Sequence, residues 1–260
     1  MSARLEFPGA VGLSQLEVYP WPTADDEHGG SPHMHLTCSE CYVVVSGHGR
    51  LETLSHKGHA TAELNPGDVV WFTPGTVHRA INDGDLRVVV VMQNSGLPEA
   101  GDAVMTFPPE YLTRERYANA ASVLDDDGRP SRQRAQARRD LAIEGFAELK
   151  RRWQRGDRSS FEEFCERAAH LVRPRLDSWA KTVDDGALAA AQATLRQIRA
   201  LGEGDLTHLS DATVTRIARP ARQTLGMCGF LHAYDPVRRA GPGDLVPQPH
   251  AAGTTPAAPS

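Results

Sequence analysis

The chain has 260 residues, a formal net charge of −5 and a pI near 6.1, with 40% hydrophobic and 23% charged residues. This balance is typical of a soluble globular protein of one or two domains, and the acidic charge excludes the basic footprint of most nucleic-acid-binding domains. No apolar stretch approaches the roughly 20 residues that a membrane helix needs, and the first residues lack the apolar core of a secretory signal. Four cysteines are too few for a disulfide scaffold and fit a reducing compartment. We therefore expect a cytoplasmic protein without nucleic-acid or membrane partners.

Before about residue 100, short valine-rich runs alternate with Gly, Pro and Asp turns. The runs occupy residues 13–19, 41–45, 69–72 and 86–92. Runs of this length with frequent turns predict an all-β barrel or sandwich. The segment NDGD at 82–85 predicts a hairpin between two strands, because Asn and Gly tolerate positive φ.

Three histidines and one glutamate in this half form a pattern typical of a metal site. His33 and His35 are two residues apart, so on an extended strand they project from the same face. Glu40 lies far enough beyond His35 to enter the next strand, and His78 enters a later strand. Three imidazoles and a carboxylate suit one divalent ion, with iron as the first guess and manganese, nickel, cobalt or zinc as alternatives.

The spacing of these residues resembles the two motifs of the cupin superfamily. The first motif is matched by His33, His35, Glu40 and Gly47, and the second by Gly67, Gly75, His78 and Asn82. Thr73 stands where the second motif has its proline, and Glu27 where the first has its leading glycine, but neither is a ligand position. The resemblance covers about residues 10–95 and implies an antiparallel, jelly-roll-like cupin barrel that holds a metal on the four residues named above. Some cupins have lost their metal, and the histidines would then be ordinary strand residues.

Tyr42 and Asn82 are the candidates for acting on a substrate. Tyr42 shares strand parity with Glu40, and Asn82 shares it with His78, so both should line the cavity. The Tyr42 hydroxyl suits positioning a substrate or donating a proton, and it equally suits a core aromatic bonded to the backbone.

Three other residues near the motifs have simpler interpretations. Cys38 and Cys41 form a CxxC pair, but no second pair accompanies it, so we interpret both as packing residues. We interpret Trp71 as a core residue rather than a platform for substrate.

After about residue 100, apolar residues recur at helical steps of three and four. One helix reaches Trp153, a second begins near Ser159 and should end or kink at Pro174, and a third runs from about 187 to 201. The basic residues Arg132, Arg134, Arg138 and Arg139 are interleaved with acidic residues at helical distances, which favours a solvated face over an anion-binding surface.

The domain prediction is a cupin barrel at 1–107, a helical region at 108–235 docked on the barrel or on a dimer partner, and a disordered tail at 236–260. Residues 212–234 are interpreted as a returning pair of strands, of which 225–234 either packs against the core or reaches over the barrel mouth. Because cupin barrels commonly pair, the resemblance implies a homodimer.

These features favour a metal-dependent enzyme that acts on a small polar organic molecule, with an iron-dependent dioxygenase or oxidase as the first hypothesis. A non-redox isomerase or lyase with manganese, nickel or zinc would use the same four ligands. A third hypothesis is a non-catalytic cupin that senses a metal or a ligand. The helical half shows no helix-turn-helix with a basic recognition face, which favours an enzyme over a regulator, and the fold alone decides no reaction.

Overall fold

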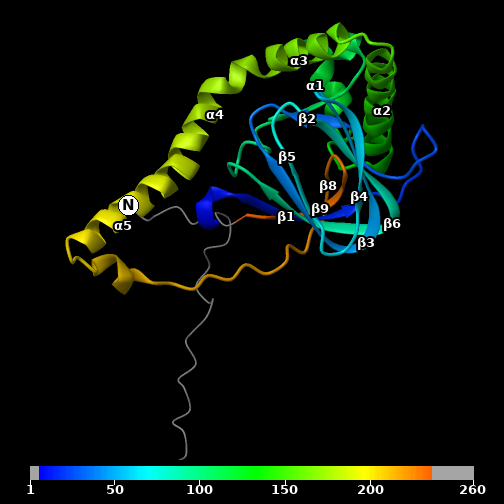
Figure 1. Cartoon of the computed structure of the whole chain (residues 1–260). Coiled ribbons are helices and arrows are strands. Elements are labelled where there is room, and N and C mark those ends of the chain that lie inside the picture. Colours follow the sequence, from blue (N-terminus) through cyan, green and yellow to red (C-terminus); the bar gives the residue numbers. More distant parts are fainter. Residues whose placement is uncertain (1–5, 236–260) are drawn as a thin grey trace, which may run out of the picture.

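The structure is a computed structural model and describes residues 6–235. The predicted tail at 236–260 therefore lies outside the described residues. Strands come first, helices follow, and two short strands return at the end (Figure 1). An antiparallel barrel followed by an α-helical region is thus confirmed.

The described strands form one antiparallel sheet that curls into the barrel (Figure 1). They are β1 (Gly12–Val18), β2 (His33–His35), β3 (Glu40–Ser55), β4 (Gly58–Leu64), β5 (Val69–Phe72), β6 (Val77–Met92), β7 (Ala103–Met105), β8 (Thr224–Leu225) and β9 (Gly229–Tyr234). The main order is β4-β3-β6-β1-β9-β8, with β5 paired to β3 and β2 paired to both β6 and β7. The long strands β3 and β6 lie side by side along most of their length, so they form the wall on which the other strands assemble.

The segment at 82–85 is not the hairpin that the sequence predicts. Strand β6 continues through it, and the register of β3 against β6 shifts three times between Val44 and Gly49. Gly47 has a φ of 73° and Asp85 a φ of 49° at this point. Turns and β-bulges need the same left-handed backbone conformations, so residues that predict a turn supply a bulge here.

The barrel and two helices, α2 (Arg132–Gln154) and α3 (Ser159–Val172), share one hydrophobic core. Phe146 and Phe161 from these helices are fully buried in the same cluster as Leu54 of the barrel. Helix α2 approaches closely at Gly145, where a Cβ atom would collide with the carbonyl oxygen of Thr106. The backbone of α2 therefore packs directly against the segment that follows β7.

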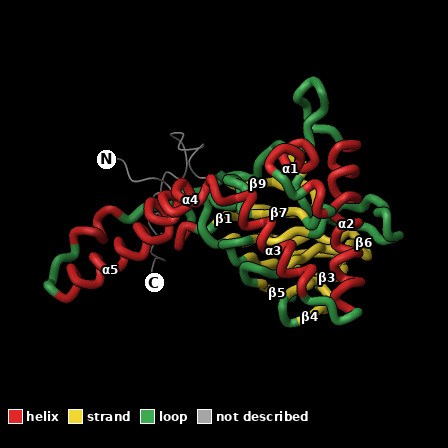
Figure 2. The backbone as a smooth tube through the Cα atoms, turned by 90° about the horizontal axis from the view of Figure 1, so that it is seen from above, coloured by secondary structure: helices red, strands yellow, loops and turns green. Residues whose placement is uncertain are grey.

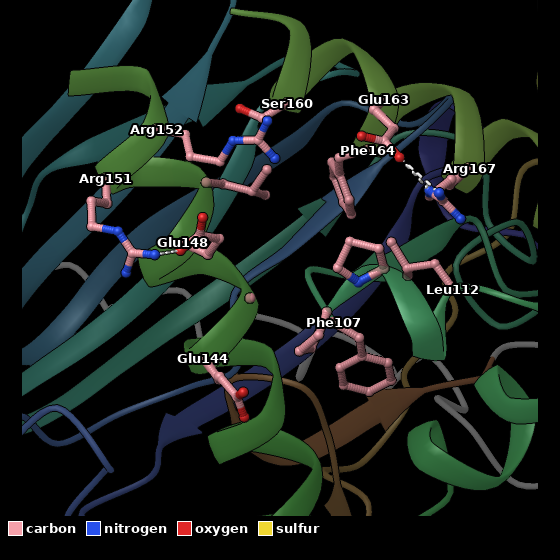
Figure 3. Close-up of a pocket in the computed structure, with 14 residues that line it drawn as sticks. Phe107, Leu112, Glu144, Glu148, Arg151, Arg152, Ser160, Glu163, Phe164 and Arg167 are labelled. Carbon is pink, nitrogen blue, oxygen red and sulfur yellow. Dashed lines mark hydrogen bonds and ion pairs between the residues drawn. The ribbon is translucent and has the colours of Figure 1, made fainter. Parts of the chain in front are cut away.

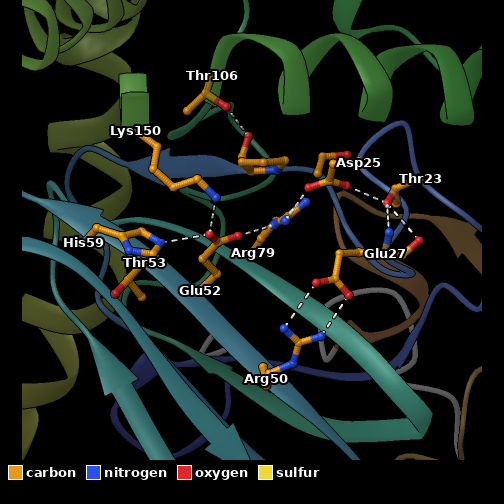
Figure 4. A network of polar contacts seen from close by, with 12 residues as sticks. Thr23, Asp25, Glu27, Arg50, Glu52, Thr53, His59, Arg79, Thr106 and Lys150 are labelled. Carbon is orange, nitrogen blue, oxygen red and sulfur yellow. Dashed lines mark hydrogen bonds and ion pairs between the residues drawn. The ribbon is translucent and has the colours of Figure 1, made fainter. Parts of the chain in front are cut away.

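A buried group of charges also joins α2 to the barrel (Figure 4). Glu52 lies 2.7 Å from Arg79, 2.8 Å from Lys150 of α2 and 2.8 Å from His59, and Arg79 lies 2.6 Å from Asp25. We call these residues the Glu52 network. Burial raises the pKa of Glu52, but the surrounding cations outweigh burial and lower this pKa to about 2. Lys150 is the member of the network on α2, so its contact with Glu52 ties this helix to the barrel.

The remaining helices are α1 (Arg114–Ala121), α4 (Leu176–Val183) and α5 (Ala189–Gly202), and α4 and α5 form an arm that extends from the barrel (Figure 2). Pro174 lies in a 3₁₀ turn between α3 and α4, which confirms the predicted break. Helix α5 corresponds to the third predicted helix and buries none of its residues. Its apolar side chains Leu195, Ile198 and Leu201 are 49–58% exposed, and we call them the exposed face of α5. No described helix is both long and apolar enough to cross a membrane.

The returning pair of strands is confirmed for residues 224–234, whereas 212–223 contain no strand. Strand β9 pairs with β1, with Leu231 opposite Leu16. The barrel sheet is therefore completed by residues that follow the helices in the chain.

Two predictions of side-chain exposure are wrong, one for Trp71 and one for the basic run of α2. Trp71 is 71% exposed, because it shares strand parity with exposed Val69 on the outer face of β5. Arg138 and Arg139 are only 7% and 1% exposed, so the basic run of α2 is not a solvated face at these positions. Both arginines lie on the side of α2 that faces the barrel, where they contact its loops.

Candidate metal centre

The four predicted ligands come together inside the structure. Strand β2 pairs with β6 so that His33 lies opposite His78, and both His33 and His35 are buried. Glu40 begins β3 and is also buried. One ligand atom from each of these four residues lies within 4.8 Å of the other three. The cluster has the geometry of a site for one metal ion.

Hydrogen bonds fix the orientation of each imidazole. The Nδ1 atoms of His33 and His78 lie 2.9 and 3.2 Å from the carbonyl oxygens of Ser31 and Thr76. The Nδ1 atom of His35 lies 2.9 Å from the carboxylate of Asp102. When Nδ1 donates to these oxygens, a neutral ring keeps the lone pair of Nε2 free for a metal.

Two buried atoms of the cluster lack a hydrogen-bond partner. They are Oε2 of Glu40 and Nε2 of His78, which lie 3.2 Å apart. Buried polar atoms without partners cost free energy, and a cation between them would remove that cost. A carboxylate oxygen and three imidazole nitrogens are donors that zinc, iron, manganese, cobalt and nickel accept. The residues present therefore fit a divalent metal ion.

Without a metal, the charges around the cluster favour a proton on His35. Burial and the charges of the other two histidines lower the pKa of His33 well below its usual value. Burial also opposes a charge on His35, but the hydrogen bond to Asp102 and the neighbouring carboxylate of Glu40 outweigh it and raise its pKa to about 9. Burial would raise the pKa of Glu40, but the adjacent imidazoles of His35 and His78 outweigh burial and lower this pKa. A metal that binds His35 must therefore displace a proton.

A cavity of about 330 Å³ opens beside the cluster and is lined by three of its members, His33, His35 and Glu40. Most of its other walls are apolar and come from β1, β6 and the turn between β8 and β9. That turn, residues 226–228, lines the cavity as well, so the final strands reach the site rather than only packing against the core. A volume of this size suits a small organic molecule.

The structure brings one of the two substrate candidates to this cavity. Tyr42 is buried and lines it, and burial together with the nearby Glu40 raises the pKa of its hydroxyl well above the usual value, so the phenol is neutral. Asn82 does not line the cavity. Its amide donates to the Val18 carbonyl, and its oxygen accepts from the backbone N–H groups of Gly84 and Leu86. These contacts give Asn82 the role of holding the bulge of β6.

Three residues at the site were not found from the sequence. Asp102 binds His35 from 67 positions away, and Arg138 and Cys228 line the cavity from α2 and from the last turn. None of them has a fixed spacing from the histidines. The one signal in the sequence is the pair of glycines around Met227 and Cys228. They indicate that the backbone packs closely against another segment, but they do not identify that segment.

A second cavity of about 340 Å³ lies between α2, α3 and the segment 107–112 (Figure 3). Four of its charged residues pair with one another, Glu148 with Arg151 and Glu163 with Arg167. None of the four clustered ligands borders it. Of these two cavities, the clustered ligands therefore border only the first.

Comparisons with known proteins agree with this architecture. Residues 24–92 match a family model described as "Cupin domain". A search of the curated proteins finds no match. The chain is similar to the CENP-C cupin domain of Drosophila melanogaster, with 19% identity over 32% of this chain and 57% of that chain and a TM-score of 0.25. It is similar to an uncharacterized conserved protein with a double-stranded β-helix domain from Klebsiella pneumoniae, with 22% identity over 35% of this chain and 75% of that chain and a TM-score of 0.26. It is also similar to a predicted oxalate decarboxylase from Thermotoga maritima, with 18% identity over 31% of this chain and 61% of that chain and a TM-score of 0.24. The chain thus covers less than two thirds of the first and third of these, and none of the likenesses indicates a reaction.

Proposed function

Because residues 24–92 form a cupin domain, we propose that the chain is a metal-dependent enzyme that acts on a small organic molecule held in the 330 Å³ cavity. The observation that supports this proposal is the buried cluster of His33, His35, Glu40 and His78, three of whose members border that cavity. Iron-dependent oxidation, as by a dioxygenase or oxidase, is the first reaction class to test. Imidazole and carboxylate ligands suit iron.

The roles of the chain's own residues follow from their contacts. When bound, the ion supplies a Lewis acid, and iron would also supply redox chemistry. Asp102 holds His35 so that its Nε2 atom faces the cluster. The neutral hydroxyl of Tyr42 offers a proton or a hydrogen bond to a molecule in the cavity. The apolar walls offer a surface on which the apolar part of such a molecule is buried.

The decisive experiment has two stages. Purified protein is first analysed for bound metals, then stripped and reloaded anaerobically with iron(II), manganese(II), nickel(II), cobalt(II) or zinc(II). Oxygen uptake is then measured with catechols, keto acids and amino acids. We expect uptake with the iron form and at least one substrate class. Turnover without oxygen uptake would indicate a non-redox isomerase or lyase, and binding without turnover would indicate a sensor.

Variants separate the metal site from the rest of the protein. The double variant His33→Ala, His78→Ala should lose at least tenfold in metal content, because it removes two ligands. His170→Ala, an exposed histidine on α3, is the matched control and should keep the wild-type metal content. A double variant that purifies with undiminished metal would show that the ion binds elsewhere.

A further inference from the structure

Arg138 of α2 lines the same cavity as His33 and Glu40. Its side chain is only 7% exposed, and its Nε atom is buried without a hydrogen-bond partner. The guanidinium donates to the carbonyl oxygen of Gly226 through Nη2, and this is its one hydrogen bond among the described residues. No carboxylate of residues 6–235 forms an ion pair with it.

The other buried arginines of the described chain differ from Arg138 in this respect. Arg79 pairs with Glu52 and Asp25. Arg139 pairs with Asp140 and also donates to carbonyl oxygens of the loop before β2. An arginine stays protonated even when buried, and a buried charge without a counter-ion is strongly destabilising. The position of Arg138 is therefore that of a residue whose counter-ion arrives with a ligand.

The rest of the cavity indicates what that ligand carries. Leu16, Val90, Met92 and Leu231 supply apolar walls. Besides Glu40, the lining holds one other carboxylate, Glu99, which is exposed and accepts a hydrogen bond from the backbone N–H of Gly96. In the metal-free protein, a single unpaired cation among apolar walls suits a group with one negative charge. A phosphate dianion would leave charge uncompensated in the same place.

We propose that Arg138 binds the carboxylate of a small organic acid whose apolar body fills the cavity beside the metal cluster. This inference rests on the proposed function, since it names the class of molecule that the metal site acts on. A guanidinium binds a carboxylate through two parallel N–H donors, so Arg138 both selects the acid and sets its orientation.

Binding of paired probes tests the inference without any mutation. Straight-chain carboxylates from acetate to octanoate, their primary amides and inorganic phosphate are titrated into the protein by calorimetry. We expect a medium-length acid to bind at least about thirtyfold more tightly than its amide, the factor typical of losing one partner of a buried charge pair. Equal binding of acid and amide, or tighter binding of phosphate to the metal-free protein, would overturn the inference.

Two variants assign the preference to one side chain. Arg138→Gln should reduce the ratio of acid to amide affinity to within threefold, while the affinity for the amide stays near the wild-type value. Arg134→Gln, on the same helix but bonded to Asn119 on the surface, should leave the ratio unchanged. Thermal melts and metal content show whether each variant is folded. A folded Arg138→Gln protein that retains the full acid preference would overturn the assignment.

Titrations of the metal-free protein separate this inference from the proposed function. Arg138 is not one of the four clustered ligands, so the acid preference should persist after the metal has been removed with a chelator. An acid preference in a protein that binds no metal under any condition would support the inference and contradict the proposed function. A metal-loaded, active protein without any acid preference would contradict the inference alone.

Discussion

Replacing Asp102 by asparagine tests how the chain prepares His35 for a metal. One oxygen of the carboxylate accepts from His35 Nδ1 (2.9 Å) and from the backbone N–H of Cys38 (3.3 Å). The other accepts from the backbone N–H of Thr37 (2.8 Å) and from its hydroxyl (2.6 Å). All four partners are donors, and Asp102 is completely buried. An amide offers only one acceptor oxygen, so the variant must place N–H groups against donors.

The consequence falls on the tautomer of His35. If the amide oxygen stays with Thr37, its NH₂ group faces Nδ1 of His35, and the proton of the ring must move to Nε2. That atom lies 3.1 Å from Oε2 of Glu40, on the side where a metal would bind. A protonated Nε2 cannot ligate. We therefore expect Asp102→Asn to lower metal affinity about tenfold to hundredfold, or about 1.4 to 2.7 kcal/mol.

The measurement is a competition between the protein and a chelator of known affinity, at one fixed pH. Asp83→Asn is the matched control, because Asp83 lies on the barrel surface and pairs with Arg50 rather than with a histidine. Thermal melts of the metal-free proteins show that each variant is folded. A folded Asp102→Asn protein with affinity within threefold of the wild type would refute the role of Asp102.

Three further predictions concern stability and assembly. The pKa of Glu52 is lowered from 4.5 to about 2 in the folded protein, so the stabilisation that ionised Glu52 gives is complete above pH ~4.5 and is lost as the pH falls toward 2, by up to about 3 kcal/mol. The free energy of unfolding measured in urea should therefore fall over this pH range, and Glu52→Gln should reduce that fall. Gly145→Ala should destabilise the protein by about 1–3 kcal/mol, although alanine favours helices, because its Cβ would meet Thr106; Gly202→Ala, with no atom within 4 Å, should not be destabilising in the same thermal melts. If the exposed face of α5 joins two copies of the chain, light scattering should show a wild-type dimer and a Leu195→Glu monomer; a monomeric wild type would contradict the expected homodimer.

The metal cluster is predictable from the sequence because its ligands are close in the chain or carried by strongly patterned strands. The alternation of a strand places His33 and His35 on one face, and the motif spacing resembles that of known cupins at Glu40 and His78. Tyr42 follows from the same alternation and lines the cavity. These inferences need only local geometry, and local geometry is what a single sequence contains.

The wrong predictions arise where one local sequence pattern fits two structures, or where the contacting residue is far away in the sequence. Asn82 and its neighbours carry the residues of a turn, but the sheet uses them for a bulge, and the Asn82 amide is occupied by backbone groups. The same alternation holds from His78 to Asn82, since the register of β6 against β3 is unbroken between them, but Asn82 lies four residues beyond the ligand and does not line the cavity. Asp102 and Arg138 reach the site from loops and helices whose packing no spacing in the sequence encodes.

The position of Arg138 also gives the helical half a part in the site itself. Helix α2 is held against the barrel by the Glu52 network and by the close approach at Gly145, and this docking carries Arg138 to the cavity. After the arm of α4 and α5, the chain returns to place Gly226 beneath the Arg138 guanidinium and to pair β9 with β1. The barrel supplies the cluster that fits a metal, whereas the later segments supply the cation and one wall of the cavity. The unit that binds substrate in our proposal therefore extends through residue 234, well beyond the segment 24–92 that matches the cupin model. Differences in α2 and in the β8–β9 turn, rather than in the metal ligands, are then where proteins of this architecture would differ in the acids they accept.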